Sequence, residues 1–516
     1  MTVINQPNVN FAIQGAQNDA ENTQQKILIV GQSLNLGAVT GELFTNLGNN
    51  GEELTMFGAG SMLEQLVRAN KVRNQQVQID AIALTDGGLG VARVFDIDLS
   101  GTATEAGVIE FTIGGSSNSY TVSINEGELG TDALTRLETL VNADPHKVAN
   151  VVVAGTTATF TTLETGTYTN TYQVRISSVD GIVATYTNTT VGGGDPVTTG
   201  IFDLVGNQRY QTVLWPYPES TETLTDFLDP RFNPDGFVLD GLGVTAINGT
   251  LNDLITLGNS LNSRSLTIIA DKSESIASPN IIEGGAINEI PMIKASQFAA
   301  IRALRLDTGG FNIADLVVGA AGLDNFSGAA LASRPYFNTP FNLLDTIDTG
   351  LGFDSQGIEQ LKDAGLTVLG NNIAGNTVIL GETVTTYKTD AAGNPDASFT
   401  FLNYVDTISQ IREYFFNNFR ARYSQYRLTE GDLVQGRPMI NEALARSSAH
   451  EFYQDLSGQD FVLVESGSDS RNFFDENLFI NINKAQGRMS IQMKVVVVTQ
   501  LRDLDGIVEI AFSVDI

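Results

Sequence analysis

The side chains best suited to chemistry are few, and they stand in incomplete patterns. His146 and His450 are far apart, and neither has a serine and an acid near it in the arrangement of a nucleophilic triad. Residues 31–33 read Gly-Gln-Ser, like the turn that presents a hydrolase nucleophile, but Asn35 replaces the second glycine of that turn. Residues 58–60 read Gly-Ala-Gly, without the Gly-Lys-Ser/Thr of a phosphate loop. Turns and helix caps explain these patterns better than catalysis, so the sequence predicts no enzyme.

Metal and cofactor sites are not predicted either. The sequence contains no cysteine, which excludes disulfides, thiolate metal sites and cysteine nucleophiles. Residues 96–100 (Asp-Ile-Asp-Leu-Ser) are too short for a calcium loop and lack its terminal glutamate. We therefore expect a protein without a cofactor.

Composition indicates a folded, strongly acidic protein of several domains. The 516 residues are 42% hydrophobic and 17% charged, and their net charge of −30 argues against a nucleic-acid partner. No apolar run approaches the length of a membrane-spanning helix, so we expect no membrane insertion. The first 25 residues lack the basic start and apolar core of a secretory signal. We therefore expect assembly in a cytoplasm.

The elements that would position any site begin with a strand–helix–strand alternation. Residues 26–31 (Lys-Ile-Leu-Ile-Val-Gly) predict a buried strand, residues 61–70 a helix and residues 77–84 a second strand. This alternation is typical of a layered α/β domain. It resumes after residue 210, following a block that is rich in Thr, Gly, Ser and Val and almost without Lys and Arg.

The fold class that follows is α/β multidomain: a mixed α/β core domain, an inserted β-rich domain, a C-terminal α+β domain and extended arms at both ends. The predicted parts are a linking arm (1–25), the α/β domain (26–92 and 206–385), the inserted outer domain (93–205) and the inner domain with its terminal linking strand (386–516).

Both ends of the chain predict strands with one apolar face, because apolar residues there alternate with polar or small ones. Such strands can pair with other copies of the chain, or the first strand can pair within its own chain. Alternation does not separate these two readings. The predicted arm-strand positions are Val9, Phe11, Ile13, Val495, Val497, Val508, Ile510, Phe512 and Val514.

Three stretches carry a resemblance to a known family. Residues 60–63 (Gly-Ser-Met-Leu) open the first helix, residues 382–399 contain the run TTY…AAG-x-PD-x-S, and residues 426–428 (Tyr-Arg-Leu) close a long helix with clustered arginines. In this order they resemble the tail sheath proteins of Mu-like contractile phages over nearly the whole chain. Residues 500–502 resemble a late strand of that family, but this chain adds Asp505-Gly506 and a further strand.

The resemblance implies a structural role in a virion tail. Such sheaths are helical stacks of hexameric rings around an inner tube, and their contraction drives the tube through the target envelope. Partners implied by the resemblance are further copies of the chain, the tail tube protein, and the baseplate and tail terminator proteins. It also implies that terminal arms add strands to the inner domain of a neighbour.

The helix predicted over residues 404–427 carries a basic cluster in an acidic chain. Its apolar positions lie at spacings of three, four and seven, which predicts one buried stripe. The clustered arginines are Arg412, Arg420, Arg422 and Arg427, of which Arg420 and Arg427 are seven apart and are expected to share one helical edge. In a sheath, this edge is expected to face an acidic inner tube. The alternative is a solvated edge, or local pairing with Glu430 and Asp432.

Two other classes of protein remain open from the sequence. A secreted surface-layer or adhesin protein would also suit the acidic Thr/Gly-rich insert, although the secretory signal is missing. An enzyme of the α/β hydrolase type would suit the central domain but lacks a nucleophile arrangement. Electron microscopy separates the three, because they would form hollow cylinders, flat lattices and dispersed monomers respectively.

Overall fold

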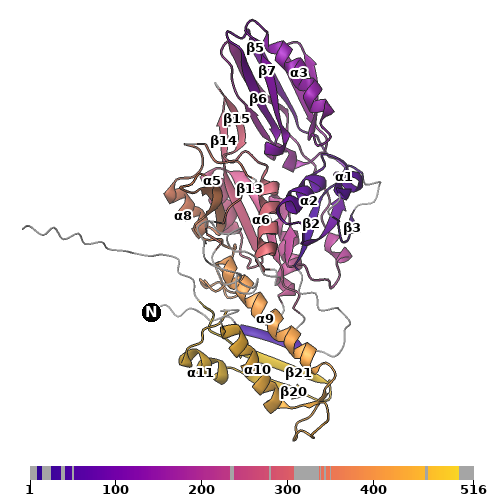
Figure 1. Ribbon diagram of the computed structural model, residues 1–516, viewed down its shortest axis with the longest axis vertical. Helices are drawn as coiled ribbons and strands as arrows, with labels where there is room; N and C mark the ends of the chain where they lie inside the picture. The colour runs from indigo at the N-terminus through magenta and orange to yellow at the C-terminus, as the bar shows by residue number, and fades with distance from the viewer. Residues whose placement is uncertain are drawn as a thin grey trace, which may run out of the picture.

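The computed structural model describes residues 8–13, 25–35, 41–48, 51–232, 238–277, 280–306, 336–337, 339–341, 344–348, 350–458 and 463–498. Three parts follow one another along its long axis (Figure 1): a β-rich part, a central α/β part and a C-terminal α+β part. Helices and several sheets occur together, so the predicted α/β multidomain class is confirmed. In the described part of the chain, no helix is long and apolar enough to cross a membrane.

The central part is built on a largely parallel sheet in the order β4-β2-β12-β13-β14-β16, with β3 and β17 added antiparallel at its two edges. Every residue of β2 is buried, as the uninterrupted apolar run predicts for a strand covered on both faces. The strands are β2 (Lys26–Gln32), β3 (Glu42–Phe44), β4 (Gln78–Leu84), β12 (Thr212–Leu214), β13 (Leu242–Gly249), β14 (Leu266–Ile276), β16 (Leu366–Asn371) and β17 (Thr377–Leu380).

Helices cover this sheet, and α2 and α6 pack on each other as well as on its strands. Ser61 caps α2, because its Oγ accepts a hydrogen bond from the backbone N of Glu64 at 3.2 Å. Four buried alanines and Phe298 let α6 approach the strands closely. The helices are α1 (Glu52–Phe57), α2 (Met62–Arg73), α4 (Thr221–Leu228), α5 (Leu251–Ser260), α6 (Pro291–Leu306) and α8 (Ser355–Asp363).

The inserted part contains two sheets and the helix α3 (Gly130–Ala143), which buries Leu134, Leu137 and Val141. One sheet has the order β11-β5-β9-β8, and the other continues from the α/β sheet through β15-β10-β6-β7. The strands are β5 (Val94–Gly101), β6 (Gly107–Gly114), β7 (Ser119–Ile124), β8 (Ala149–Ala154), β9 (Thr157–Thr162), β10 (Gln173–Ile176), β11 (Ile182–Thr190) and β15 (Ile281–Gly285).

A long hairpin joins the insert to the α/β part. The first half of β14 pairs with β13, and its second half, from Ser273 to Ile276, pairs with β15. β15 in turn pairs with β10 of the insert. Strands from both sides of the insertion therefore share a continuous ladder, and the second sheet of the insert is completed by residues that lie outside 93–205 in the sequence.

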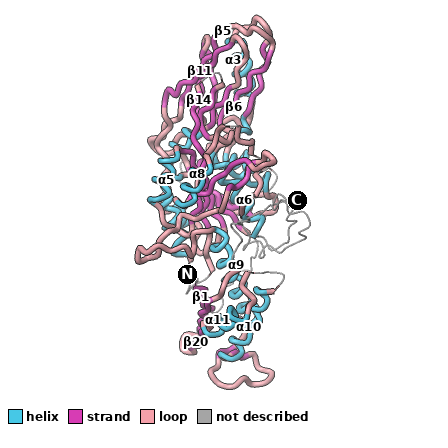
Figure 2. The backbone as a smooth tube through the Cα atoms, turned by 90° about the vertical axis from the view of Figure 1, so that its left-hand side faces the viewer, coloured by secondary structure: helices cyan, strands magenta, loops and turns pink. Residues whose placement is uncertain are grey.

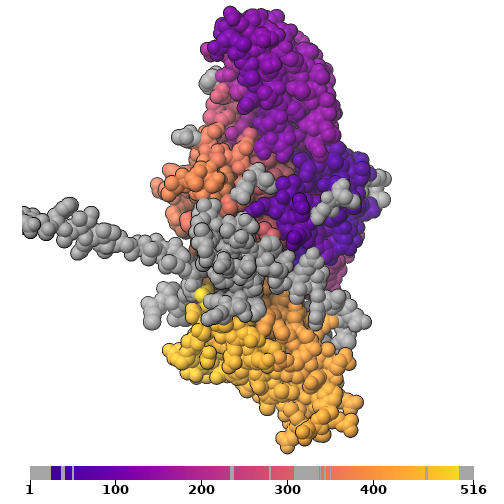
Figure 3. Space-filling view, in the orientation of Figure 1, coloured from indigo at the N-terminus to yellow at the C-terminus, as the bar shows by residue number. Residues whose placement is uncertain are grey.

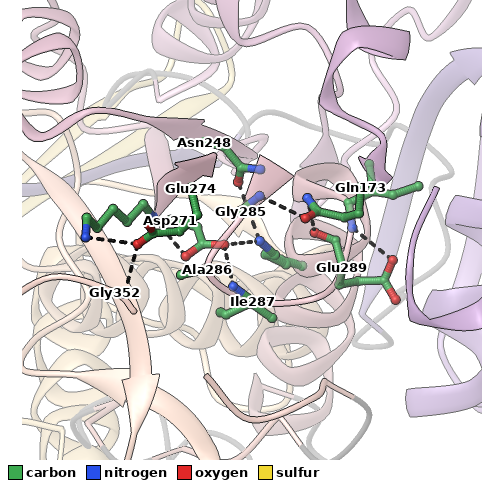
Figure 4. A network of polar contacts seen from close by, with 12 residues as sticks. Gln173, Asn248, Asp271, Glu274, Gly285, Ala286, Ile287, Glu289 and Gly352 are labelled. Atoms are coloured by element: carbon green, nitrogen blue, oxygen red, sulfur yellow. Dashed lines mark hydrogen bonds and ion pairs between the residues drawn. The ribbon is translucent and has the colours of Figure 1, made fainter. Parts of the chain in front are cut away.

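Buried polar contacts fix this hairpin where it leaves the α/β sheet (Figure 4). Asp271 on β14 forms an ion pair with Lys294 of α6, and both side chains are almost fully buried. Burial lowers the pKa of Lys294, and the charge of Asp271 opposes that shift. Asp271 also accepts a hydrogen bond from the N of Ile287 at 3.0 Å, while Gln173 Oε1 of β10 accepts one from the N of Gly285 at 2.8 Å. Side chains of three elements thus hold the turn after β15.

The C-terminal part forms a lobe of its own at one end of the molecule (Figure 3). Its core is a second cluster of buried side chains, contributed mainly by one long helix, two shorter ones and a small sheet. The elements are α9 (Leu402–Tyr423), β18 (Arg427–Leu428), β19 (Met439–Ile440), α10 (Glu442–Ser457), α11 (Ser468–Glu476), β20 (Phe479–Asn483) and β21 (Arg488–Lys494), together with β1 (Asn8–Ile13) from the N-terminal end.

Candidate inter-subunit interface

The N-terminal strand lies in the C-terminal lobe, nearly the whole chain length away in sequence. β1 pairs antiparallel with β21 from Asn8 opposite Lys494 to Ile13 opposite Met489, and β21 pairs with β20 on its other side. The sheet therefore has the order β1-β21-β20. The predicted positions Val9, Phe11 and Ile13 fall within β1. In this single chain, β1 pairs with β21 of the same chain. Its exchange between copies stays a prediction.

The predicted strand over residues 495–497 has a different environment. β21 ends at Lys494; Val495 is fully buried, and Val497 is 9% exposed and bridges to Val464 of the same lobe. Both valines thus pack in the core of their own chain. The remaining predicted arm positions, Val508, Ile510, Phe512 and Val514, lie outside the described residues.

The helix α9 spans two cores. Leu402 and Val405 belong to the core of the α/β part, whereas the next positions of the same stripe belong to the core of the C-terminal lobe. The predicted stripe is confirmed at Val405, Ile408, Ile411, Phe415 and Phe419, all of which are buried. Because one continuous helix enters both cores, it couples the lobe to the body.

The end of this helix corrects one prediction. The helix ends at Tyr423, and the chain then turns, so that the N of Arg427 donates to Pro438 O at 2.9 Å and begins β18. The prediction that Arg420 and Arg427 share one helical edge is therefore wrong. Tyr426, predicted in the buried stripe, is 39% exposed.

Arg412 lies in the interior and not on a basic surface. Its side chain is 1% exposed, and its Nη1 lies 3.2 Å from Asp240 Oδ1. Its guanidinium also stacks over the ring of Phe232, 4.6 Å from the ring centroid. Burial favours the neutral acid at Asp240, but the charges of Arg412 and Arg209 hold the pKa of this carboxyl below its ordinary value. Arg412 thus forms a buried ion pair between α9 and the α/β part.

The other three arginines are accessible. Arg422 forms a two-pronged pair with Glu451 of α10, at 2.6 and 2.8 Å, and this hydrogen bonding lowers the pKa of Glu451. Arg420 is partly exposed in the last turn of α9, and Arg427 is exposed on β18. These two side chains lie on neighbouring elements at the same end of α9.

Buried ion pairs between α9 and the body were missed from the sequence. Asp406 is fully buried; its Oδ1 accepts from Arg302 Nε at 3.1 Å, and its Oδ2 accepts from the hydroxyl of Tyr336 at 2.6 Å. Arg209 pairs with Glu413 at 2.8 Å. The signal available was the presence of acids inside an amphipathic helix, but their arginine partners lie more than a hundred residues away in the sequence.

Each of the two histidines lies beside an acid. His146 lies 3.2 Å from Glu64, and His450 lies 3.2 Å from Asp475. Within the part of the chain that the structure describes, no group of three or more His, Cys, Asp or Glu could hold a metal ion. What the C-terminal lobe presents is a small sheet with two edges, at β1 and at β20, and accessible arginines beside it.

Comparison with known proteins relates this arrangement to a family. No protein-family model matches the chain. The chain is 21% identical over 441 residues to the Mu-like prophage FluMu tail sheath protein of Haemophilus influenzae, and the match covers 84% of this chain and 82% of that protein. A similarity that extends over most of both chains confirms the predicted resemblance to the tail sheath proteins of Mu-like phages.

Proposed function

We propose that this chain is the structural subunit of a contractile tail sheath, which polymerises as stacked hexameric rings around an inner tube and contracts to drive the tube through a host envelope. The observation that carries the proposal is the place of β1: the N-terminal strand fills an edge of the C-terminal sheet. The similarity to a phage tail sheath protein supports the same role.

Chain length supports an exchange of β1 between copies. Twelve steps along the chain separate Ile13 from Gln25, the next described residue, and an extended chain of that length reaches at most about 40 Å. The strand that fills the edge of its own sheet could therefore fill the equivalent edge of an adjacent copy. Such an exchange creates the same main-chain pairing between subunits without any new surface.

Strand exchange suits a polymer whose bodies move. β1 and β21 align six residue pairs. Each net hydrogen bond contributes about 0.5–1.5 kcal/mol, so several bonds in one ladder make rupture rare. The bonds lie along one line, which lets the bodies at either end rotate while the link remains.

The accessible arginines are proposed to face the tail tube. Arg420, Arg422 and Arg427 lie at one end of α9 and on the adjacent β18. Arg412 is not part of this surface, because its ion pair with Asp240 is buried. Baseplate and tail terminator proteins would bind the ends of the polymer, and the assembled sheath would form in the host cytoplasm and belong to the virion.

Electron microscopy of the purified chain, alone and with its tube protein, tests the proposal. We expect hollow cylinders with stacked rings. Flat lattices would favour a surface-layer protein, and dispersed monomers under all conditions would contradict a sheath.

Deletion of residues 1–20 removes β1 and tests its part in assembly. We expect the variant to keep the thermal unfolding of the α/β part, because β1 lies only in the C-terminal lobe. It should fail to form cylinders. Unchanged assembly would show that β1 does not link subunits.

A further inference from the structure

In the part of the chain that the structure describes, helices cover one side of the sheet of the C-terminal lobe and leave the other side uncovered (Figure 2). The covered side holds Met489, Ile491 and Met493, all of which are buried in the core of the lobe. Figure 2 shows α10 and α11 on one side of the lobe and β1 and β20 on the other. We name the uncovered side the open sheet face; its side chains, which alternate with the buried ones, include Phe479, Asn481, Arg488, Ser490, Gln492 and Lys494.

The open sheet face carries amides, cations and one aromatic ring. Neither β20 (Phe-Ile-Asn-Ile-Asn) nor β21 (Arg-Met-Ser-Ile-Gln-Met-Lys) contains an acid. Phe479 is 57% exposed and lies opposite Gln492, and Asn481 lies opposite Ser490, so these side chains form one continuous patch. An exposed aromatic ring surrounded by amides is typical of the centre of a protein interface.

Charge indicates which partner this face fits. Residues 25–401 contain 18 Lys and Arg against 41 Asp and Glu, whereas residues 402–498 contain 10 against 12. The acidic excess of the chain thus lies in the body and the insert, and the C-terminal lobe is nearly neutral. A face without any carboxylate in such a chain is complementary to the body of another copy.

We propose that the open sheet face binds the acidic surface of the α/β part or insert of a second copy, with Phe479 at the centre of the contact and Lys494 paired to a carboxylate. The proposal rests on the proposed function, because it names the partner of one surface in the polymer. Arg420 and Arg427 lie on α9 and β18, so tube and neighbouring copy would use different elements. The contact joins two different surfaces, and repeated from copy to copy it produces a ring or an open stack.

Photo-crosslinking in assembled cylinders tests which molecule covers the face. Position 479 is replaced by benzoylphenylalanine, and crosslinked peptides are identified by mass spectrometry. We expect crosslinks to residues 25–401 of another copy. The matched control is the same probe at Arg471, which is exposed on α11 on the helical side of the lobe. The proposal would be overturned if position 479 crosslinked to the tube protein or only to another C-terminal lobe. It would also be overturned if position 479 formed no crosslink.

Charge reversal gives a second readout that does not depend on the probe. Lys494→Glu should raise the concentration needed for assembly about tenfold at low salt, with a smaller effect at high salt. Arg471→Glu makes the same change in charge on α11 and should leave that concentration unchanged. Equal effects of both variants would contradict the proposal.

The two proposals fail in different ways. If the unmodified chain forms no cylinders, the sheath function and the contact both fall. If cylinders form but the crosslinks lead elsewhere, the sheath function stands and only the contact is wrong.

Discussion

At the scale of single residues, Glu164 is a buried carboxyl between the insert and the body. It follows β9, and its Oε2 accepts from the N of Met62, the first residue of α2, at 2.8 Å. The hydroxyl of Tyr168 donates to the same carboxyl, and the acids Asp86 and Glu64 are near it. Burial raises the pKa of Glu164 to about 8, with a contribution from these two charges. The carboxyl is therefore neutral in the folded protein at pH 7.

The raised pKa of Glu164 predicts that the contact between the insert and the body becomes less stable as the pH rises. Between the ordinary pKa of 4.5 and the folded value of about 8, the unfolded chain has released the Glu164 proton while the folded chain keeps it. The contribution of the Glu164 proton to the free energy of unfolding is therefore fully present below pH 4.5. It is lost as the pH rises toward 8, by up to about 1.4 kcal/mol per pH unit. Glu164→Gln should flatten this part of the curve, as measured by thermal unfolding at pH 5, 6.5 and 8.

A matched substitution isolates the effect of burial. Glu126→Gln removes one carboxyl from an exposed position of the same insert and should leave the slope of stability against pH unchanged. If Glu164→Gln keeps the slope of the unmodified protein, the Glu164 carboxyl does not titrate across this range.

Buried and exposed ion pairs of α9 should differ in what they contribute. Asp406→Ala leaves the guanidinium of Arg302 buried without its carboxylate, which should cost about 3–5 kcal/mol of unfolding free energy. Glu451→Ala removes the partner of Arg422 at a site open to water and should cost far less unfolding free energy than Asp406→Ala. Denaturant unfolding of the two variants, followed through the C-terminal lobe, compares them. Equal losses would mean that Asp406 does not anchor α9.

At the scale of elements, patterns within one segment could be predicted from the sequence. The alternation of Val9, Phe11 and Ile13 predicted a strand, and the spacing from Val405 to Phe419 predicted the buried stripe of α9. What could not be predicted depends on residues distant in sequence. The end of α9 at Tyr423 is accompanied by pairing of β18 with β19, and the role of Arg412 is decided by Asp240.

The hairpin of β14 and β15 shows the same limit. No local pattern in residues 266–285 says that its second half leaves one sheet and enters another. The pairing depends on the position of β10, which the insertion brings close. Composition marked the insert by its lack of Lys and Arg, but composition says nothing about a ladder shared between two parts of the chain.

The separation of Arg420 and Arg427 onto two elements leads to a prediction about the tube. If both face it, Arg420→Glu and Arg427→Glu should each weaken tube-templated assembly, and the double variant should lose more than either one. The effect should shrink as salt screens the charges. Sedimentation of sheath with tube at two salt concentrations measures this. Assembly that is insensitive to both changes would show that these arginines are merely solvated.

At the scale of the whole molecule, one continuous helix joins body and lobe. α9 contributes side chains to both cores, and the buried pairs Arg302–Asp406 and Arg412–Asp240 lie at its junction with the body. Separating the lobe from the body would expose these charges without partners, which is costly. Large changes in a polymer of this chain are therefore expected at the links between copies rather than within each copy.

The absence of cysteine allows a direct test of where β1 lies in the polymer. Asn10 is aligned with Gln492, so cysteines at these two positions can form a disulfide between β1 and β21. If β1 is exchanged, oxidation of assembled cylinders should produce a ladder of covalent multimers on a denaturing gel, while oxidation of the dissociated chain should produce monomers with an internal bond. The control pair, Asn481→Cys with Ser490→Cys, lies between β20 and β21 of one chain and should produce monomers in both states. Monomers alone from the Asn10–Gln492 pair in intact cylinders would place β1 on its own chain and end the case for linked subunits.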